Sequence, residues 1–81
     1  MEPELIRKSL IDIMQAISPD NDYSSIKDDA PLREQFDLDS MDFLDIVLEL
    51  RRQYSIDVPE SDYEHLQTMN SSITYLGSKM P

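Results

Sequence analysis

Residues 36–50 read FDLDSMDFLDIVLEL, and this stretch decides the fold. Its apolar side chains recur at helical spacing, which predicts a helix over residues 40–54. Asp39 or Ser40 is expected to be the N-cap, because both side chains accept hydrogen bonds from free backbone N–H groups. The apolar arc covers more than half of the circumference, which predicts a helix enclosed by neighbours on several sides. Its members are Phe43, Leu44, Ile46, Val47, Leu48, Leu50 and Tyr54.

Helices are expected on both sides of this central one. Residues 4–17 predict a first helix, opened by Pro3 and carrying one apolar stripe. Thr68 predicts the cap of a closing helix over about residues 69–79. Between them, Ser61 and Glu64 have the spacing of a capping box, which predicts a short helix near residues 61–66. The two stripes are Ile6, Leu10, Ile13, Met14 and Ile17, and Met69, Ile73, Leu76 and Met80.

Residues 18–38 form a long connection without a sustained period. Its apolar side chains are expected to pin it to the core, and residues 31–34 predict a short helical turn. Those side chains are Tyr23, Ile26, Leu32, Phe36 and Leu38. Together the elements predict an all-α, antiparallel four-helix bundle in a single domain over residues 1–81, with three main helices, a short third helix and a long loop between helices 1 and 2.

Composition and charge exclude several classes of function. The net charge is −10, and from Asp37 to Glu64 there are nine acidic residues and two basic ones. A nucleic-acid binder needs the opposite sign, so basic protein partners are expected instead. The chain has no cysteine, which excludes disulfides, thiolate metal sites and a cysteine nucleophile. With no long apolar run and a polar N-terminus, neither a membrane span nor a signal peptide is expected, and the chain is predicted to be a cytoplasmic monomer.

Ser40 lacks the surroundings of a catalytic or metal site. A serine nucleophile needs an adjacent base, and His65, the only histidine, lies on another predicted helix. A calcium loop starting at Asp37 would need an oxygen ligand at the fifth position, glycine at the sixth and glutamate at the twelfth, and the pattern fails at Met41, Asp42 and Leu48. No catalytic residue and no specific metal site are therefore predicted, beyond weak divalent binding to clustered carboxylates.

Two interpretations of Ser40 remain open from the residues alone: a simple N-cap and a modification site. A serine at a helix N-terminus is exposed and lies beside N–H groups that stabilise an attached phosphate. Another enzyme would then supply the activation that the neighbouring residues lack. Asp42, Asp45 and Glu49 follow at spacings of three and four, so they project from one face of the helix and predict a docking face for a basic partner.

Asp39-Ser40-Met41, followed by an apolar and acidic helix, resembles the Asp-Ser-Leu signature of acyl carrier proteins. The resemblance covers essentially the whole chain and continues through residues 56–59 (Ile-Asp-Val-Pro) and 67–69 (Gln-Thr-Met). It implies a carrier and not an enzyme, with 4′-phosphopantetheine attached covalently to Ser40 by a phosphopantetheinyl transferase. The arm's thiol would hold acyl groups as thioesters, sheltered between the helices. The resemblance further implies that Asp39 helps to hold metal during arm transfer and that Met41 packs against the transferase and the arm.

The expected partners are this transferase and acyl-loading and acyl-processing enzymes with basic docking patches. The pathway would be fatty-acid, polyketide or specialised lipid synthesis. The sequence Met-Asp-Phe-Leu after the serine, in place of the common Leu-Asp form, favours a specialised carrier. The alternatives are an aminoacyl or peptidyl carrier, which is usually less acidic, and an acidic helical adaptor in which Ser40 is only a cap. Two positions depart from the family pattern: Asp37 stands where glycine is usual, and Arg51-Arg52 ends the acidic helix with positive charge. Aspartate tolerates left-handed backbone better than most residues, and the two arginines suit the helix dipole.

Overall fold

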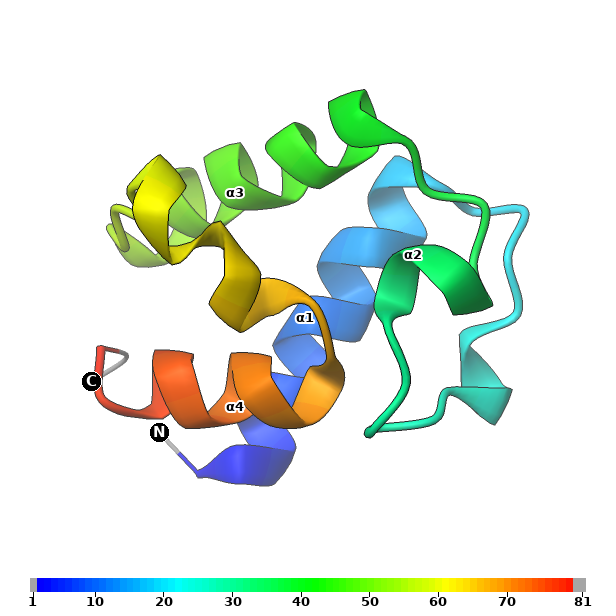
Figure 1. The fold of residues 1–81 in the computed structure, drawn as a ribbon, viewed down its shortest axis with the longest axis horizontal. Coiled ribbons are helices and arrows are strands. Elements are labelled where there is room, and N and C mark those ends of the chain that lie inside the picture. Colours follow the sequence, from blue (N-terminus) through cyan, green and yellow to red (C-terminus); the bar gives the residue numbers. More distant parts are fainter. Residues whose placement is uncertain (1, 80–81) are drawn as a thin grey trace.

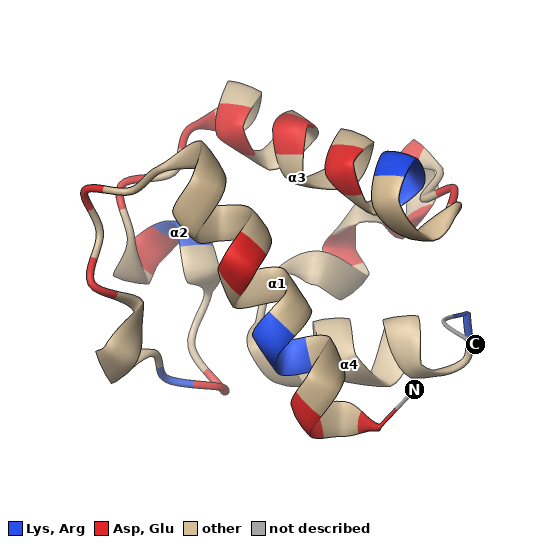
Figure 2. Ribbon diagram, turned by 180° about the vertical axis from the view of Figure 1, so that it is seen from behind, with Lys and Arg blue, Asp and Glu red and all other residues tan. Residues whose placement is uncertain are grey.

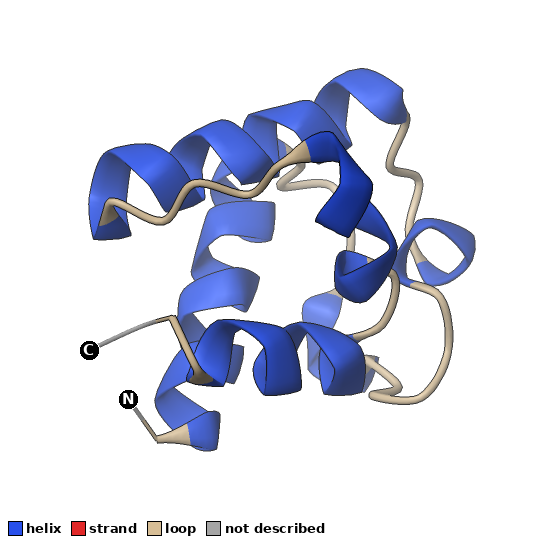
Figure 3. Ribbon diagram, turned by 60° about the vertical axis from the view of Figure 1, so that its left-hand side comes forward, coloured by secondary structure: helices blue, strands red, loops and turns tan. Residues whose placement is uncertain are grey.

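The computed structural model describes residues 2–79, and within that range it is built of helices and loops without a strand (Figure 3). The elements, in which η marks a 3₁₀ helix, are α1 (Pro3–Ile17), η1 (Tyr23–Ser25), α2 (Leu32–Gln35), α3 (Ser40–Tyr54), η2 (Glu60–Leu66) and α4 (Met69–Gly77). The predicted all-helical bundle is therefore confirmed. Met80, assigned to the stripe of the last helix, lies outside the described residues.

Helix α1 forms the centre of the bundle and contacts both α3 and α4. In Figure 1, α3 and α4 both run from right to left, and α1 rises behind them from the lower middle to the upper right. The extended segment after α3 and the short η2 lead the chain back, so that α4 starts below the first half of α3. This return brings η2 into contact with α4.

One contiguous core joins these elements. Helix α1 contributes the stripe that its sequence predicts, with Ile17 only half-buried. Leu50, Met69 and Leu76 have no exposed surface at all. Ser72, also almost fully buried, satisfies its hydroxyl by donating to the Thr68 carbonyl at 2.7 Å. The buried apolar set is Ile6, Leu10, Ile13, Met14, Tyr23, Leu32, Phe36, Leu38, Ile46, Val47, Leu50, Ile56, Val58, Leu66, Met69 and Leu76.

The long connection is pinned to the core, as its apolar residues predict. The rings of Tyr23 and Phe36 pack with centroids 4.6 Å apart. The Tyr23 hydroxyl is within hydrogen-bonding distance of two carbonyl oxygens at the end of α1, those of Met14 at 3.2 Å and Ser18 at 2.9 Å. The predicted helical turn is present as α2, and the backbone N–H of Leu32 donates to the Gln67 carbonyl at 2.8 Å. These contacts hold α2 near the start of α3.

The prediction that α3 is enclosed on several sides is wrong. Met41, Leu44 and Leu48 are 70%, 41% and 59% exposed, and only Ile46, Val47 and Leu50 of this helix are buried. Within residues 2–79, α1 is the helix that makes the main contact with α3, and nothing covers the opposite side. A chain this short has no further element with which to bury a second face.

The helix ends also differ in two places from the prediction. Helix η2 begins at Glu60, directly after Pro59, and has no side-chain cap, so the capping box expected at Ser61 and Glu64 is wrong. Pro59 starts the turn before Ser61, which therefore lies inside the helix. Helix α4 is capped by Thr68 as predicted but ends at Gly77 rather than at residue 79, where glycine has a poor helix propensity.

Candidate functional site

Ser40 is the first residue of α3 and is exposed, but it is not the N-cap. Asp39 is the N-cap and forms a reciprocal capping box with Asp42. The Asp42 N–H donates to Asp39 Oδ1 at 2.9 Å, and the Asp39 N–H donates to Asp42 Oδ2 at 3.2 Å. The simple-cap interpretation of Ser40 is therefore wrong, and its hydroxyl has no capping role.

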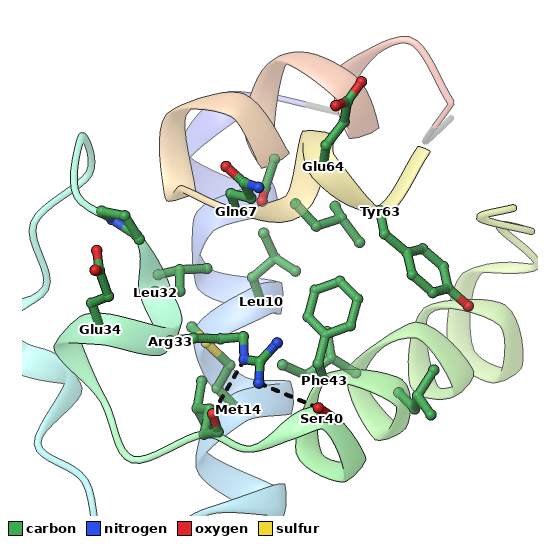
Figure 4. Close-up of a pocket in the computed structure, with 16 residues that line it drawn as sticks. Leu10, Met14, Leu32, Arg33, Glu34, Ser40, Phe43, Tyr63, Glu64 and Gln67 are labelled. Atoms are coloured by element: carbon green, nitrogen blue, oxygen red, sulfur yellow. Dashed lines mark hydrogen bonds between the residues drawn. The ribbon is translucent and has the colours of Figure 1, made fainter. Parts of the chain in front are cut away.

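Arg33 of α2 reaches from the side to the start of α3 (Figure 4). Its Nη2 donates to Ser40 Oγ at 3.4 Å, and its Nε donates to the Leu38 carbonyl at 3.4 Å. Arg33 was not among the site residues predicted from the sequence. It lies seven residues before Ser40 in a segment without a sustained period, so no spacing rule links the two side chains.

A cavity of about 790 Å³ lies beside Ser40, between α1, α2, α3 and η2, and Ser72 of α4 also lines it (Figure 4). Its lining is mainly apolar and includes Leu10, Met14, Leu32, Phe43, Leu44 and Tyr63. The rings of Phe43 and Tyr63 meet edge to face across α3 and η2, with centroids 5.3 Å apart. Ser40 and Arg33 both belong to the lining, so the hydroxyl has direct access to an apolar space.

Helix η2 forms one wall of this cavity and is held against α4 by side-chain contacts. The Tyr75 hydroxyl donates to Asp62 Oδ2 at 2.7 Å, and His65 stacks on the Tyr75 ring with centroids 5.2 Å apart. Burial, together with the hydrogen bond to the Asp62 carboxylate and its charge, raises the pKa of Tyr75 to about 12. The contacts of His65 are thus with the η2–α4 junction, and no hydrogen bond joins it to Ser40 within the described chain.

The three acidic residues predicted to form a docking face differ in their local partners. Acidic positions recur along successive turns of α3, in red in Figure 2. Asp42 belongs to the capping box, and Glu49 accepts from Gln53 at 2.7 Å and pairs with Arg52 at 2.8 Å. Hydrogen bonds from Gln53 and then Arg52 hold the pKa of Glu49 below its ordinary value. Asp45 is exposed and, within residues 2–79, has no hydrogen bond or ion pair from its side chain.

Exposed apolar side chains surround Asp45. Met41, Leu44 and Leu48 lie four, one and three residues from it, so the four share one face of the helix. We call Met41, Leu44, Asp45 and Leu48 the outer surface of α3. An exposed apolar stripe on so small a protein is typical of an interaction site.

Asp37, at the position where the family usually has glycine, does not use a left-handed backbone. Among residues 2–79 the only positive φ belongs to Ser55, at 58°, which ends α3. The Asp37 N–H donates to Asn21 Oδ1 at 3.3 Å, which ties the turn to the loop after α1. The turn before Ser40 therefore forms without the conformation for which glycine is needed.

Residues 2–79 contain neither a cluster suited to a metal ion nor a membrane-spanning helix. No group of three or more histidine, aspartate or glutamate side chains has the arrangement needed to hold a metal ion. No helix within that range is long and apolar enough to cross a membrane.

The arrangement around Ser40 fits a covalently attached phosphate ester with an apolar extension. The hydroxyl is exposed and takes no part in capping, a guanidinium donates to it, and the first turn of a 15-residue helix leaves N–H groups at its positive end. The adjoining cavity has room for an apolar chain.

Comparison with known proteins gives the class to which this site belongs. Residues 5–76 match the family described as the phosphopantetheine attachment site. The acyl carrier protein of Lactobacillus johnsonii is 31% identical over 77 residues, which cover 95% of this chain and 94% of that protein. The acyl carrier proteins of Rubrobacter xylanophilus and Amoebophilus asiaticus are 25% and 27% identical over 73 and 78 residues, covering 86% and 93% of this chain and 90% and 92% of theirs.

The chain therefore belongs to the acyl carrier protein family, whose cofactor is phosphopantetheine. The predicted family and cofactor are confirmed, and a carrier role follows from them. Ser40 as the attachment residue and the acidic face of α3 as the partner surface stay predictions.

Proposed function

We propose that this chain carries acyl groups as thioesters on a 4′-phosphopantetheine arm attached to Ser40 and delivers them to partner enzymes. The observation that carries the proposal is the position of the Ser40 hydroxyl in the Asp-Ser-Met turn. The hydroxyl is exposed, Asp39 caps the helix in its place, and Ser40 lines the apolar cavity. No other serine of the family-matched region combines this signature with such a position.

Attachment is a phosphoryl transfer from coenzyme A. The Ser40 Oγ–P bond forms as the P–O bond to the departing nucleotide breaks, and the hydroxyl proton passes to a base. That base belongs to the transferase, because the partner of Ser40 Oγ within residues 2–79 is Arg33, which only donates. Asp39, directly before the serine, is assigned the role of helping to hold the metal ion of the transferase complex.

The attached group supplies a terminal thiol, which this cysteine-free chain lacks. The chain's own residues do the rest. The capping box holds Ser40 at the helix start, and the cavity lined by Leu10, Phe43 and Tyr63 removes apolar cargo from water.

Partner enzymes are proposed to dock basic patches on the outer surface of α3. Met41, Leu44 and Leu48 supply apolar contact area there, and Asp45 supplies an unpaired charge beside the site of attachment. The net charge of −10 favours encounter with positive surfaces. Asp42 and Glu49 extend the acidic face, although each already has a partner within the chain.

The cargo is proposed to be acyl, within fatty-acid, polyketide or specialised lipid synthesis. The three relatives described above are each called acyl carrier proteins, which supports acyl over aminoacyl or peptidyl cargo.

Intact mass after incubation with coenzyme A, Mg²⁺ and a broad-specificity phosphopantetheinyl transferase tests the proposal. The protein should gain the mass of one phosphopantetheine group, and Ser40→Ala should gain none. Ser72→Ala, which changes a buried serine, and Ser61→Ala, which changes an exposed one, should load as the wild type does. A wild-type chain that never gains the group, or a Ser40→Ala chain that does, would overturn the proposal.

A further inference from the structure

Arg33 is one of four cations within residues 2–79 that form no ion pair, with Lys27, Arg51 and Lys79, and it is the one whose guanidinium contacts Ser40. Arg7, Lys8 and Arg52 each form an ion pair with a carboxylate, at 3.2, 3.0 and 2.8 Å. Within residues 2–79 Arg33 makes no ion pair, although Glu34, Asp37 and Asp39 are close to it in sequence. Its guanidinium donates instead to two neutral oxygens, one of which is Ser40 Oγ.

A guanidinium in this position is suited to a phosphate on the serine oxygen. Nη2 lies 3.4 Å from the atom to which phosphorus would bond, so the unesterified phosphate oxygens would lie beside it. A phosphate oxygen carries negative charge and accepts a hydrogen bond more strongly than a hydroxyl does. Arginine binds phosphate through two parallel N–H groups, which a lysine cannot do.

The electrostatics of the turn give Arg33 a second role. Asp37, Asp39 and Asp42 surround Ser40 in sequence, and these carboxylates oppose a further negative charge at this place. Arg33 is the cation that contacts the serine oxygen, so it offsets part of this repulsion. Its second bond, from Nε to the Leu38 carbonyl, keeps the guanidinium beside the turn.

We infer that Arg33 is a positioning residue for the phosphodiester of the arm: on attachment its guanidinium exchanges Ser40 Oγ for the phosphate and holds the base of the arm at the mouth of the cavity. This inference rests on the proposed attachment to Ser40. It assigns to α2 a function in holding the arm, in addition to its packing against the core.

Phosphorus NMR of the loaded protein tests the inference without any partner enzyme. Wild type, Arg33→Gln, Arg33→Lys and Arg51→Gln are loaded enzymatically, and intact mass first establishes that each carries one arm. Arg51→Gln is the matched control, because it removes the same charge from an exposed position in the last turn of α3. The phosphodiester resonance should move in Arg33→Gln, move less in Arg33→Lys, and stay at the wild-type position in Arg51→Gln.

A second measurement needs no variant. In the wild-type protein labelled with ¹⁵N, the Nε–H resonance of Arg33 should shift when the arm is attached, and that of Arg51 should not. If Arg33→Gln and Arg51→Gln give the wild-type phosphorus resonance and the Arg33 signal does not respond to loading, the inference is wrong while the attachment stands. If no sample gains the arm, the proposed function itself fails.

Discussion

Replacing Asp39 and Ser40 separately by alanine should separate the contribution of Asp39 to the stability of α3 from the role of Ser40 in attachment of the arm. Asp39→Ala removes the side chain that accepts the Asp42 N–H at 2.9 Å, and an N-cap of this kind contributes about 1 kcal/mol. Loss of a carboxylate at the positive end of the helix dipole adds a few tenths of a kcal/mol, on the order of 0.3. We therefore expect Asp39→Ala to lower the free energy of unfolding by about 1–1.5 kcal/mol, or roughly 4–12 °C in Tm for a domain of this size.

Ser40→Ala should cost almost nothing in stability. Its hydroxyl accepts a single exposed hydrogen bond of 3.4 Å, and alanine has a better helix propensity than serine. The free energy of unfolding should stay within about 0.5 kcal/mol of the wild-type value. Loading with phosphopantetheine should nevertheless be abolished.

Asp39→Asn separates capping from charge. Asparagine caps a helix about as well as aspartate, so stability should be nearly that of the wild type. The negative charge assigned to metal binding is lost, so arm transfer should be slowed. Urea unfolding followed by circular dichroism measures the first quantity, and the time course of intact mass measures the second. Equal destabilisation by Asp39→Ala and Ser40→Ala, or a loss above about 1 kcal/mol for Ser40→Ala, would refute the assignment of the cap.

Three further predictions concern the surface and the η2–α4 junction. Asp45→Lys should slow arm transfer, and the difference from the wild-type rate should shrink as salt is added. Exposed charges act mainly on the rate of encounter and are screened over roughly 8–10 Å. An equal effect from Glu2→Lys would show that net charge alone matters. Leu48→Ala should change the free energy of unfolding by no more than about 0.5 kcal/mol while weakening partner binding, because Leu48 is exposed. Val47→Ala, in the core, should lower the free energy of unfolding by about 1–3 kcal/mol. Similar unfolding curves for the two variants would contradict the exposure described here. The pKa of Tyr75 is raised to about 12, so the unfolded chain loses the hydroxyl proton near pH 10 while the folded chain keeps it. The contribution of this proton to the free energy of unfolding is therefore complete below pH 10 and falls between pH 10 and 12. Unfolding measured across that range should show this fall in the wild type and not in Tyr75→Phe.

The sequence alone determined the features that depend on neighbours along the chain. Helical spacing of apolar residues predicted α1, α3 and α4, and the Asp-Ser-Met turn identified the family. Side-chain capping at Thr68 was also predicted, because a cap bonds to N–H groups two or three residues away. The capping rule could not choose between Asp39 and Ser40, since both side chains accept the same bond and the register of the first turn decides which one does.

Tertiary structure decided the features that join distant segments. The predicted enclosure of α3 failed because an apolar arc shows which residues can be buried, not whether another element is present to cover them. The cavity beside Ser40 draws its walls from five elements, and no single period encodes it. Arg33 meets Ser40 only because Tyr23, Leu32 and Phe36 anchor the long loop and α2 to the core, and contacts of that kind depend on the packing of the whole chain.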